Sequence, residues 1–390
     1  MKICFWVSHV ATVGGVQRVT AVISRELSER HEITVISNDS DDDIKKNIYK
    51  LPENVRILKE PKGLTRIPTA KKILKRINKL TGIFNKESRL KAMEAVYVPE
   101  STKASLVTFF NSFDFDCIVG VQGFNSLFLA SVSDRLSAKT VGWQHKCFSG
   151  YFRSRNRYFW NQDELFKKYL KRLDRYVVLN DDDKADVDRE FEINSTVIHN
   201  PRSFTSEEKC DPYKKSFIAS GRFVYSKGFD MLIEALSLFA RKNRDWDCIL
   251  VGDGIERPKI ERLIRKKKIA DRIIMTGYTD DIKKYFLKAS VLVMPSREEG
   301  MPMTILEAFE LGCPVIAFDI DAVRPLLRDE KDGLIVKRSE GAVGLAKAMS
   351  RLSEDTELRV KMHRNVILKA EEFDLKKTVQ KWEKEIFNLV

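Results

Sequence analysis

The chain has 390 residues, 43% of them hydrophobic, which suffices for two α/β domains with separate cores. No run approaches the roughly 18 apolar residues that cross a bilayer, and the six cysteines are scattered without a Cys-x-x-Cys pair, so we expect a cytoplasmic protein with buried, reduced thiols. The formal net charge of +13 calls for an anionic partner or a solvated basic surface.

The N-terminal half alternates strand and helix patterns. Strands are predicted at 3–8, 32–37, 116–121, 139–145 and 176–179, with a helix at 16–29 and an acidic turn at 38–43. Gly14 and Gly15 separate the first strand from the helix, and a residue without Cβ lets the backbone approach a ligand closely. This βα succession predicts a doubly wound parallel sheet, with 176–179 as its last strand.

Much of the positive charge lies between residues 45 and 91. Apolar residues at 73, 74, 77 and 80 alternate there with cations in the pattern of a basic amphipathic helix; the cations are Lys71, Lys72, Lys75, Arg76 and Lys79. Three interpretations remain open: a solvated helix face, a surface for anionic lipid headgroups, and a nucleic-acid patch, which we weigh least. We expect no nucleic-acid partner.

A polar stretch with two prolines, 199–215, is the predicted linker. A second βα series starts at Phe217 and continues with strand patterns at 248–254, 273–278, 291–294 and 315–319. We therefore divide the chain into an N-terminal domain (1–200), a second domain (201–370) and a C-terminal helix (371–390).

Two cations flank the loop that opens the second series. The apolar strand from Phe217 ends in Gly221, and Arg222 and Lys227 follow before the next helix pattern. Open α/β sheets bind ligands at the carboxyl ends of their strands, and Arg with Lys suits a diphosphate. Either cation alone would more often be a solvated charge.

Two carboxylates bracket a turn that enters a helix after the strand at 291–294. These are Glu299 and Glu307, and Pro302 between them suits the first helical position. Backbone N–H groups of residues 300–304 at the helix start favour a phosphate, while the carboxylates can accept hydrogen bonds from sugar hydroxyls. This segment and the Arg222/Lys227 loop together predict a site for a diphosphate with sugar hydroxyls beside it.

These segments, with Glu307-Ala308, Gly312-Cys313-Pro314-Val315 and Gly14-Gly15-Val16-Gln17-Arg18, resemble the retaining glycosyltransferases of family 4, also called group 1. The resemblance covers nearly the whole chain. It implies the GT-B fold, in which two Rossmann-like doubly wound domains face each other across a cleft, the first binding the acceptor and the second the donor. It also implies that the C-terminal helix crosses back to the N-terminal domain.

The resemblance assigns roles to individual residues. Arg222 and Lys227 would stabilise the leaving diphosphate, Glu299 would lie near the transferred sugar, and Glu307 would accept hydrogen bonds from the ribose. His145 matches the histidine that reaches toward the donor sugar. The remaining donor-binding positions are Gly14, Gly15, Gly221, Gly252, Tyr278, Gly300, Met301, Met303 and Thr304.

A departure from the family pattern follows the strand at 315–319. Relatives often carry a glycine before an acidic residue there, where this chain has Ile320-Asp321-Ala322-Val323-Arg324. Asp321 or Arg324 is expected to serve a sugar hydroxyl. Asp-x-Asp triplets at 114/116, 181/183, 245/247 and 319/321 fit solvated turns better than a metal site, so we expect no metal and no cofactor.

The expected reaction is transfer of a hexose from a nucleoside diphosphate sugar, with UDP as the favoured nucleotide, to a glycan or lipid-linked acceptor of lipopolysaccharide, capsule or O-antigen. The lipid-linked acceptor would bring the enzyme to the inner membrane face. A sugar-nucleotide epimerase or a phosphorylase on the same fold, and a non-catalytic membrane-surface protein, are the alternatives, since a fold does not fix a function.

Overall fold

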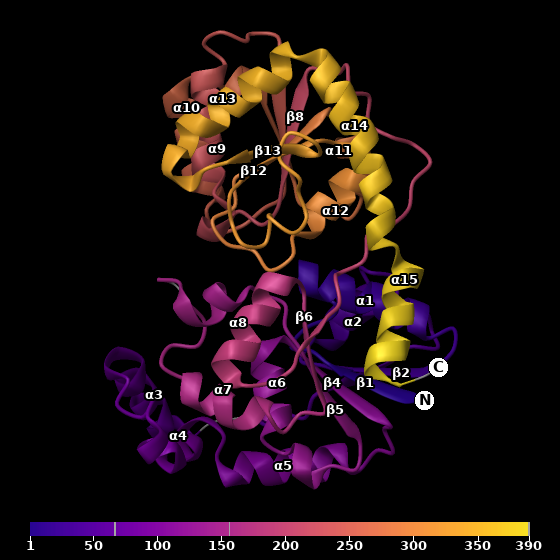
Figure 1. Cartoon of the computed structure of the whole chain (residues 1–390), viewed down its shortest axis with the longest axis vertical. Coiled ribbons are helices and arrows are strands. Elements are labelled where there is room, and N and C mark those ends of the chain that lie inside the picture. The colour runs from indigo at the N-terminus through magenta and orange to yellow at the C-terminus, as the bar shows by residue number, and fades with distance from the viewer. Residues whose placement is uncertain (66–67, 156, 389–390) are drawn as a thin grey trace. The chain divides into compact units, whose positions relative to one another are not determined.

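The computed structural model describes residues 1–65, 68–155 and 157–388 (Figure 1). They form two compact units, of which the first comprises Met1–Asn200 with Leu375–Val390 and the second Pro201–Asp374. The C-terminal segment joins the first unit from residue 375, whereas the sequence places its start at 371. Leu389 and Val390, the end of the predicted C-terminal helix, lie outside the described residues.

The first unit contains a seven-stranded parallel sheet in the order β3-β2-β1-β4-β5-β6-β7. Its strands are β1 (Lys2–Trp6), β2 (Glu32–Ser37), β3 (Arg56–Lys59), β4 (Cys117–Val121), β5 (Lys139–Trp143), β6 (Arg175–Val178) and β7 (Thr196–Val197). The prediction that 176–179 is the last strand was wrong, because the two residues of β7 are too few to show an apolar period. The order is that of a doubly wound Rossmann sheet, which reverses between β1 and β4.

The helices of this unit are α1 (Gly15–Leu27), α2 (Asp41–Lys46), α3 (Thr69–Thr81), α4 (Leu90–Tyr97), α5 (Glu100–Phe110), α6 (Gln122–Ala130), α7 (Asp163–Leu170) and α8 (Asp181–Phe191). The predicted acidic turn at 38–43 runs into α2. Ser40 caps that helix by accepting a hydrogen bond from the Asp43 amide, and the acidic side chains of its first turn favour the positive end of the helix dipole.

The C-terminal segment packs beside α1 (Figure 1), and its aromatic side chain Trp382 contacts rings of the sheet. α15 (Leu375–Lys381) continues into a π-helical turn at Trp382–Ile386. The fully buried Trp382 ring lies 4.8 Å from the Trp143 ring and 6.3 Å from the Phe5 ring, measured between centroids. The segment is therefore part of the first unit's core.

The second unit contains a six-stranded parallel sheet in the order β10-β9-β8-β11-β12-β13. Its strands are β8 (Ser216–Ser220), β9 (Asp247–Val251), β10 (Ile273–Gly277), β11 (Val291–Met294), β12 (Val315–Phe318) and β13 (Gly333–Val336), the last of which the sequence patterns missed. This order also reverses in the middle, between β8 and β11. Ligands of such sheets bind at the carboxyl ends of the strands beside the reversal.

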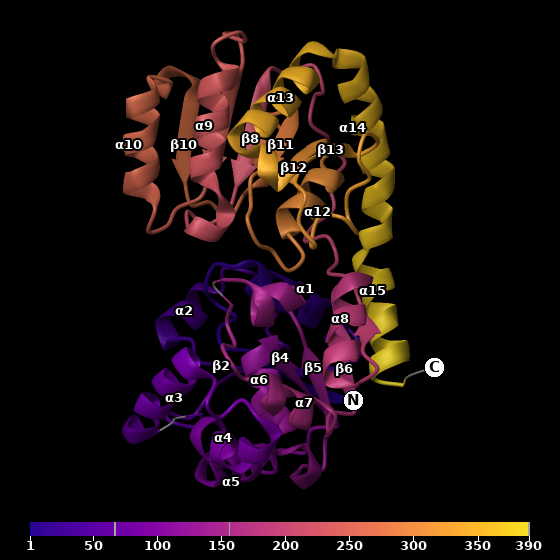
Figure 2. The ribbon, with the colours of Figure 1, turned by 60° about the vertical axis from the view of Figure 1, so that its left-hand side comes forward.

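The helices of the second unit are α9 (Phe229–Phe239), α10 (Arg257–Lys267), α11 (Lys283–Phe286), α12 (Met303–Glu310), α13 (Gly341–Glu354) and α14 (Thr356–Ala370). α9 packs against α10 and α13, and α12 packs against α14 (Figure 2). Among the helices of the described residues, none is both long and apolar enough to cross a membrane.

A buried arginine near the start of the second unit forms hydrogen bonds with residues at its end. The side chain of Arg202, only 8% exposed, donates to Glu310 at the end of α12 (2.8 Å), to Glu371 (2.8 Å) and to Asp374 (3.1 Å). Its backbone N–H also donates to the Phe373 carbonyl. The predicted linker is therefore fixed to the second unit by hydrogen bonds from Arg202 onward.

Replacing Arg202 with methionine is expected to lower the free energy of unfolding by about 3 kcal/mol, because the buried Glu310 carboxylate loses its guanidinium partner. Lys209 and the Ser206 amide still bond Glu310, which limits the loss. Urea unfolding followed by circular dichroism measures it, with hydrogen exchange of the α12 amides as the local readout.

Arg351→Met is the matched control. Arg351 pairs with Glu330, but the two side chains are 48% and 51% exposed, so its removal should change the free energy of unfolding by less than about 1 kcal/mol. Equal effects of the two substitutions would contradict the role given to Arg202.

Candidate functional site

The loops that follow β8 and β11 form the candidate site of the second unit. β8 and β11 are adjacent parallel strands, so their carboxyl ends lie side by side. The first loop carries Arg222 and Lys227, and the second carries Glu299 before α12 begins. The structure thus brings together two segments that are 72 residues apart in the sequence.

Lys227 and Glu299 meet directly. The Lys227 ammonium donates to both carboxylate oxygens of Glu299, at 2.6 and 2.7 Å, and the Ser296 hydroxyl donates to Oε1 at 2.7 Å. The Glu299 side chain is only 10% exposed. Two of the three N–H donors of Lys227 are therefore engaged with a largely buried carboxylate.

A second ion pair, which the sequence analysis missed, joins the same two loops. Arg297 donates to both oxygens of Asp230 at 2.8 Å and to the Tyr225 carbonyl at 2.7 Å, and its guanidinium lies 4.2 Å from the centroid of the Tyr225 ring. Burial would raise the pKa of Asp230, but the hydrogen bonds and charge of Arg297 outweigh it and hold the pKa below its ordinary value. The only signal in the sequence was the proximity of both residues to the predicted site.

Glycine is required where these loops touch. Gly228 has φ +68°, and a Cβ there would lie 1.9 Å from the Pro295 carbonyl oxygen. Gly252 has φ +136°, and its Cβ would lie 2.0 Å from the carbonyl oxygen of Gly221. The backbones of the loops after β8, β9 and β11 are thus in contact, with no room for a side chain between them.

The helix start predicted for phosphate binding is present. α12 begins at Met303, so Pro302 is its N-cap and not its first helical residue as predicted; the cap needs no helical φ/ψ, and Pro302 adopts an extended conformation. Gly300 and Met301 lead into the helix, while Met303 and Thr304 lie in its first turn, where backbone N–H groups have no partner within the helix.

Glu307 lies one turn further along α12 and is almost fully buried. Its Oε1 accepts a hydrogen bond from the Ser203 hydroxyl at 3.0 Å. Glu299 and Glu307 therefore have different protein partners. Ser203 was not singled out in the sequence because it lies 104 residues away, in the predicted linker.

The other predicted donor-binding residues of this unit lie at the ends of its strands. The N–H of Gly221 donates to the Val251 carbonyl, and that of Gly252 donates to the Gly277 carbonyl, which links the ends of β8, β9 and β10. Tyr278, directly after β10, has a half-exposed ring, and Arg222 is exposed. Asp321 and Arg324 pair with each other, and Arg324 also bonds Asp319 at 2.7 Å.

The remaining predicted residues belong to the first unit. His145 follows β5 and is buried, and its Nε2 has no hydrogen-bond partner among the described residues. Burial lowers the pKa of His145 to about 3, so its ring is neutral at pH 7. Gly14 caps α1, but its N–H and carbonyl are both bonded to the Tyr49 hydroxyl; Gly15 opens the helix and is exposed.

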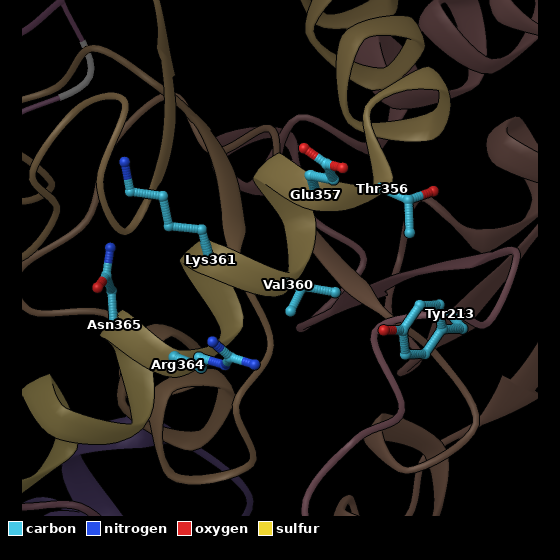
Figure 3. Close-up of a pocket in the computed structure, with 7 residues that line it drawn as sticks. All are labelled: Tyr213, Thr356, Glu357, Val360, Lys361, Arg364 and Asn365. Atoms are coloured by element: carbon cyan, nitrogen blue, oxygen red, sulfur yellow. The ribbon is translucent and has the colours of Figure 1, made fainter.

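Two hollows in the structure lie elsewhere. One, of about 310 Å³, runs along α14 and past Tyr213; in Figure 3 the side chains of Lys361 and Asn365 point away from Tyr213. The other, of about 500 Å³, lies in the first unit beside Tyr176 and Glu192. None of the predicted site residues lines either hollow.

Comparison with known proteins finds similarity to glycosyltransferases. Residues 204–369 match the family model of glycosyl transferases group 1. An uncharacterized glycosyltransferase of Haemophilus influenzae is 24% identical over 98% of each chain. A Campylobacter jejuni enzyme, named as an α-1,4-N-acetyl-D-galactosaminyltransferase acting on a diphosphoundecaprenol-linked glycan, is 23% identical over 98% of this chain and 97% of its own.

The fold is shared with solved structures. TarM of S. aureus, in complex with fondaparinux, α-GlcNAc-glycerol and UDP, superposes with a TM-score of 0.77 over 98% of each chain at 16% identity. The predicted fold class, two Rossmann-like α/β domains of the GT-B type, is confirmed. The chain is therefore a glycosyltransferase with the GT-B fold, and its residues 204–369 match the group 1 family model.

Proposed function

We propose that the enzyme transfers a hexose from a UDP-sugar, with retention of anomeric configuration as in family 4, to a glycan or lipid-linked acceptor of a surface polysaccharide. The observation that carries the proposal is the Lys227–Glu299 pair beside the start of α12, at the strand-order reversal of the second unit. The UDP in the TarM complex and the lipid-linked acceptor in the name of the Campylobacter relative support the choice of donor and acceptor.

The cations of the first loop would stabilise the leaving diphosphate. Lys227 keeps one N–H donor beyond the two that Glu299 accepts, and Arg222 is exposed on the same loop. The amides of Met301, Met303 and Thr304 add the partial positive charge of a helix start. Fixed positive groups of this kind stabilise the charge that develops on the phosphates as the sugar departs.

The two carboxylates would hold the hydroxylated parts of the donor. Glu307 is assigned to the ribose, where its hydroxyls would share Oε1 with Ser203. Glu299 is assigned to the transferred sugar and not to nucleophilic attack, because its ion pair with Lys227 lowers the nucleophilicity of the carboxylate. A lone pair that remains can still accept a hydrogen bond from a sugar hydroxyl. In the proposed front-face reaction the leaving phosphate takes the acceptor proton, so no protein base is needed.

His145 would act as a neutral hydrogen-bond partner of the donor sugar. Its buried Nε2 lacks a partner among the described residues, and a buried polar atom without one is costly unless a ligand satisfies it. Gly14 and Gly15, Gly221 and Gly252, and Tyr278 keep their assignment to the donor. We also propose that the enzyme meets its acceptor at an anionic membrane surface.

The alternatives differ in what they consume. A transferase releases nucleoside diphosphate only when an acceptor is present, a phosphorylase requires inorganic phosphate, and an epimerase needs neither. Release of nucleoside diphosphate measured with acceptor, with inorganic phosphate and with neither, together with conversion of the nucleotide sugar when both are absent, separates the three. Release that depends on phosphate alone would refute transfer.

Lys227→Ala is expected to lower kcat/KM by roughly a hundredfold, which corresponds to ~3 kcal/mol of lost transition-state stabilisation. Lys242→Ala, which removes an exposed cation of the same unit, should leave kcat/KM unchanged. Steady-state kinetics with a nucleotide-sugar panel provides the measurement. A folded Lys227 variant with wild-type turnover would remove Lys227 from the mechanism.

Acid should destabilise the protein partly through His145. The unfolded imidazole takes up a proton near pH 6.5, but the folded one does so only near pH 3. The folded state therefore loses stability as pH falls from 6.5 toward 3, by up to about 1.4 kcal/mol per pH unit from this group. Chemical unfolding of wild type and His145→Gln across this range should show a shallower decline in the variant; parallel curves would contradict a buried neutral His145.

Metal removal should not impair transfer, because Arg222, Lys227 and the start of α12 already supply positive charge to the diphosphate. Activity after EDTA treatment is expected to equal that of the untreated enzyme. Loss of activity that Mg²⁺ or Mn²⁺ restores would overturn this assignment.

A further inference from the structure

Helix α3 presents its apolar side to solvent. Ile73, Ile77 and Leu80 recur at helical spacing on one stripe and are 63%, 41% and 85% exposed. An amphipathic helix on a water-soluble domain normally turns such a stripe toward the core. α3 lies at the periphery of the first unit beside α4, as Figures 1 and 2 show.

The opposite side of α3, which contacts the unit, is polar. Asn78 is completely buried: its Nδ2 donates to the Asn161 carbonyl (2.8 Å) and to the Tyr97 hydroxyl (3.2 Å), and its Oδ1 accepts from the Phe84 amide (2.8 Å). Asn161 returns a hydrogen bond to the Asn78 carbonyl at 2.9 Å. These paired bonds fix the rotation of the helix.

Lysine also takes part in this inward contact. The Lys75 ammonium lies 4.8 Å from the centroid of the Tyr97 ring, and Lys71 is half-buried. Of the five cations assigned to a possible anionic-lipid surface, Lys71 and Lys75 are therefore the two less exposed ones. The cations that remain on the outer side are Lys72, Arg76 and Lys79.

These three cations follow one edge of the apolar stripe, and α3 contains no Asp or Glu. Lys79 lies 5.2 Å and Arg157 lies 4.2 Å from the centroid of the Trp160 ring. Exposed aliphatic side chains bordered by Lys, Arg and Trp are the composition of helices that lie in the headgroup region of a bilayer.

We infer that α3 docks the enzyme on an anionic lipid bilayer, with Ile73, Ile77 and Leu80 inserted among the acyl chains and Lys72, Arg76 and Lys79 at the phosphate headgroups. The inference rests on the proposed encounter with a lipid-linked acceptor, whose sugar must be reached at the membrane. A nucleic acid would leave the aliphatic stripe without a partner. A second copy of the chain would bring two rows of like charge together, which is repulsive.

The test uses the full chain and vesicles of phosphatidylglycerol mixed with phosphatidylcholine. Wild type should co-sediment with them, and added salt or vesicles of phosphatidylcholine alone should weaken binding. Ile73→Ser/Ile77→Ser/Leu80→Ser should lower the partition coefficient roughly a hundredfold. Val343→Ser/Leu368→Ser, which removes exposed apolar side chains of the second unit, should bind as wild type does.

The charged edge is tested separately. Lys72→Gln/Arg76→Gln should lower binding about fivefold per cation removed. Arg262→Gln/Lys266→Gln removes two exposed cations at the same spacing on α10 and should have no effect. The substituted side chains are exposed, so circular dichroism should show every variant folded.

Turnover distinguishes failure of docking from failure of the proposed chemistry. The stripe variant should transfer sugar to a water-soluble acceptor at the wild-type rate, since α3 holds none of the proposed donor-binding residues. Wild-type vesicle binding by the stripe variant would overturn the inference, as would an equal loss in the Val343/Leu368 control. A wild-type dimer in sedimentation velocity that the stripe variant converts to monomer would assign the stripe to a second copy instead and also overturn it.

Discussion

The contact between two loop backbones determines the candidate site. Gly228 lies so close to Pro295 that no Cβ fits between them, and the Arg297 amide donates to the Ser226 carbonyl at 2.7 Å. This approach sets the distance at which Lys227 reaches Glu299. A bulkier residue at 228 would separate the loops and leave a largely buried carboxylate without its cation, which is far more costly than losing a surface ion pair.

The sequence predicted the ingredients of this site but not how they pair. Strand ends, glycines and charges located Lys227 and Glu299 correctly in the loops, because those features are local. That the loops are neighbours follows from β8 lying beside β11, although β9 and β10 intervene in the chain. The bonds of Arg297 to Asp230 and of Ser203 to Glu307 span 67 and 104 residues, so no local pattern indicated them.

Helix α3 shows a second limit of periodicity. The alternation of apolar and basic residues correctly predicted an amphipathic helix. A hydrophobic period shows that the two faces of a helix differ in polarity, but it does not show which face packs against the domain. The deciding residues are Asn78 and Asn161, which are 83 positions apart. The fully buried Asn78 side chain has hydrogen-bond partners for both its amide nitrogen and its amide oxygen, which fixes its position. The polar side of the helix that carries Asn78 therefore faces the domain, whereas the pattern alone predicts that a polar side faces solvent.

Arg202 links the two ends of the second unit to helix α12. The chain enters this unit at Pro201 and leaves it at Asp374, and one guanidinium bonds both the exit and the end of α12. Both junctions are thus bonded, directly or through Arg202, to the helix that carries Glu307. Two neighbouring residues of the entering segment thus connect it to α12: Arg202 bonds Glu310, and Ser203 bonds Glu307, the proposed partner of the ribose.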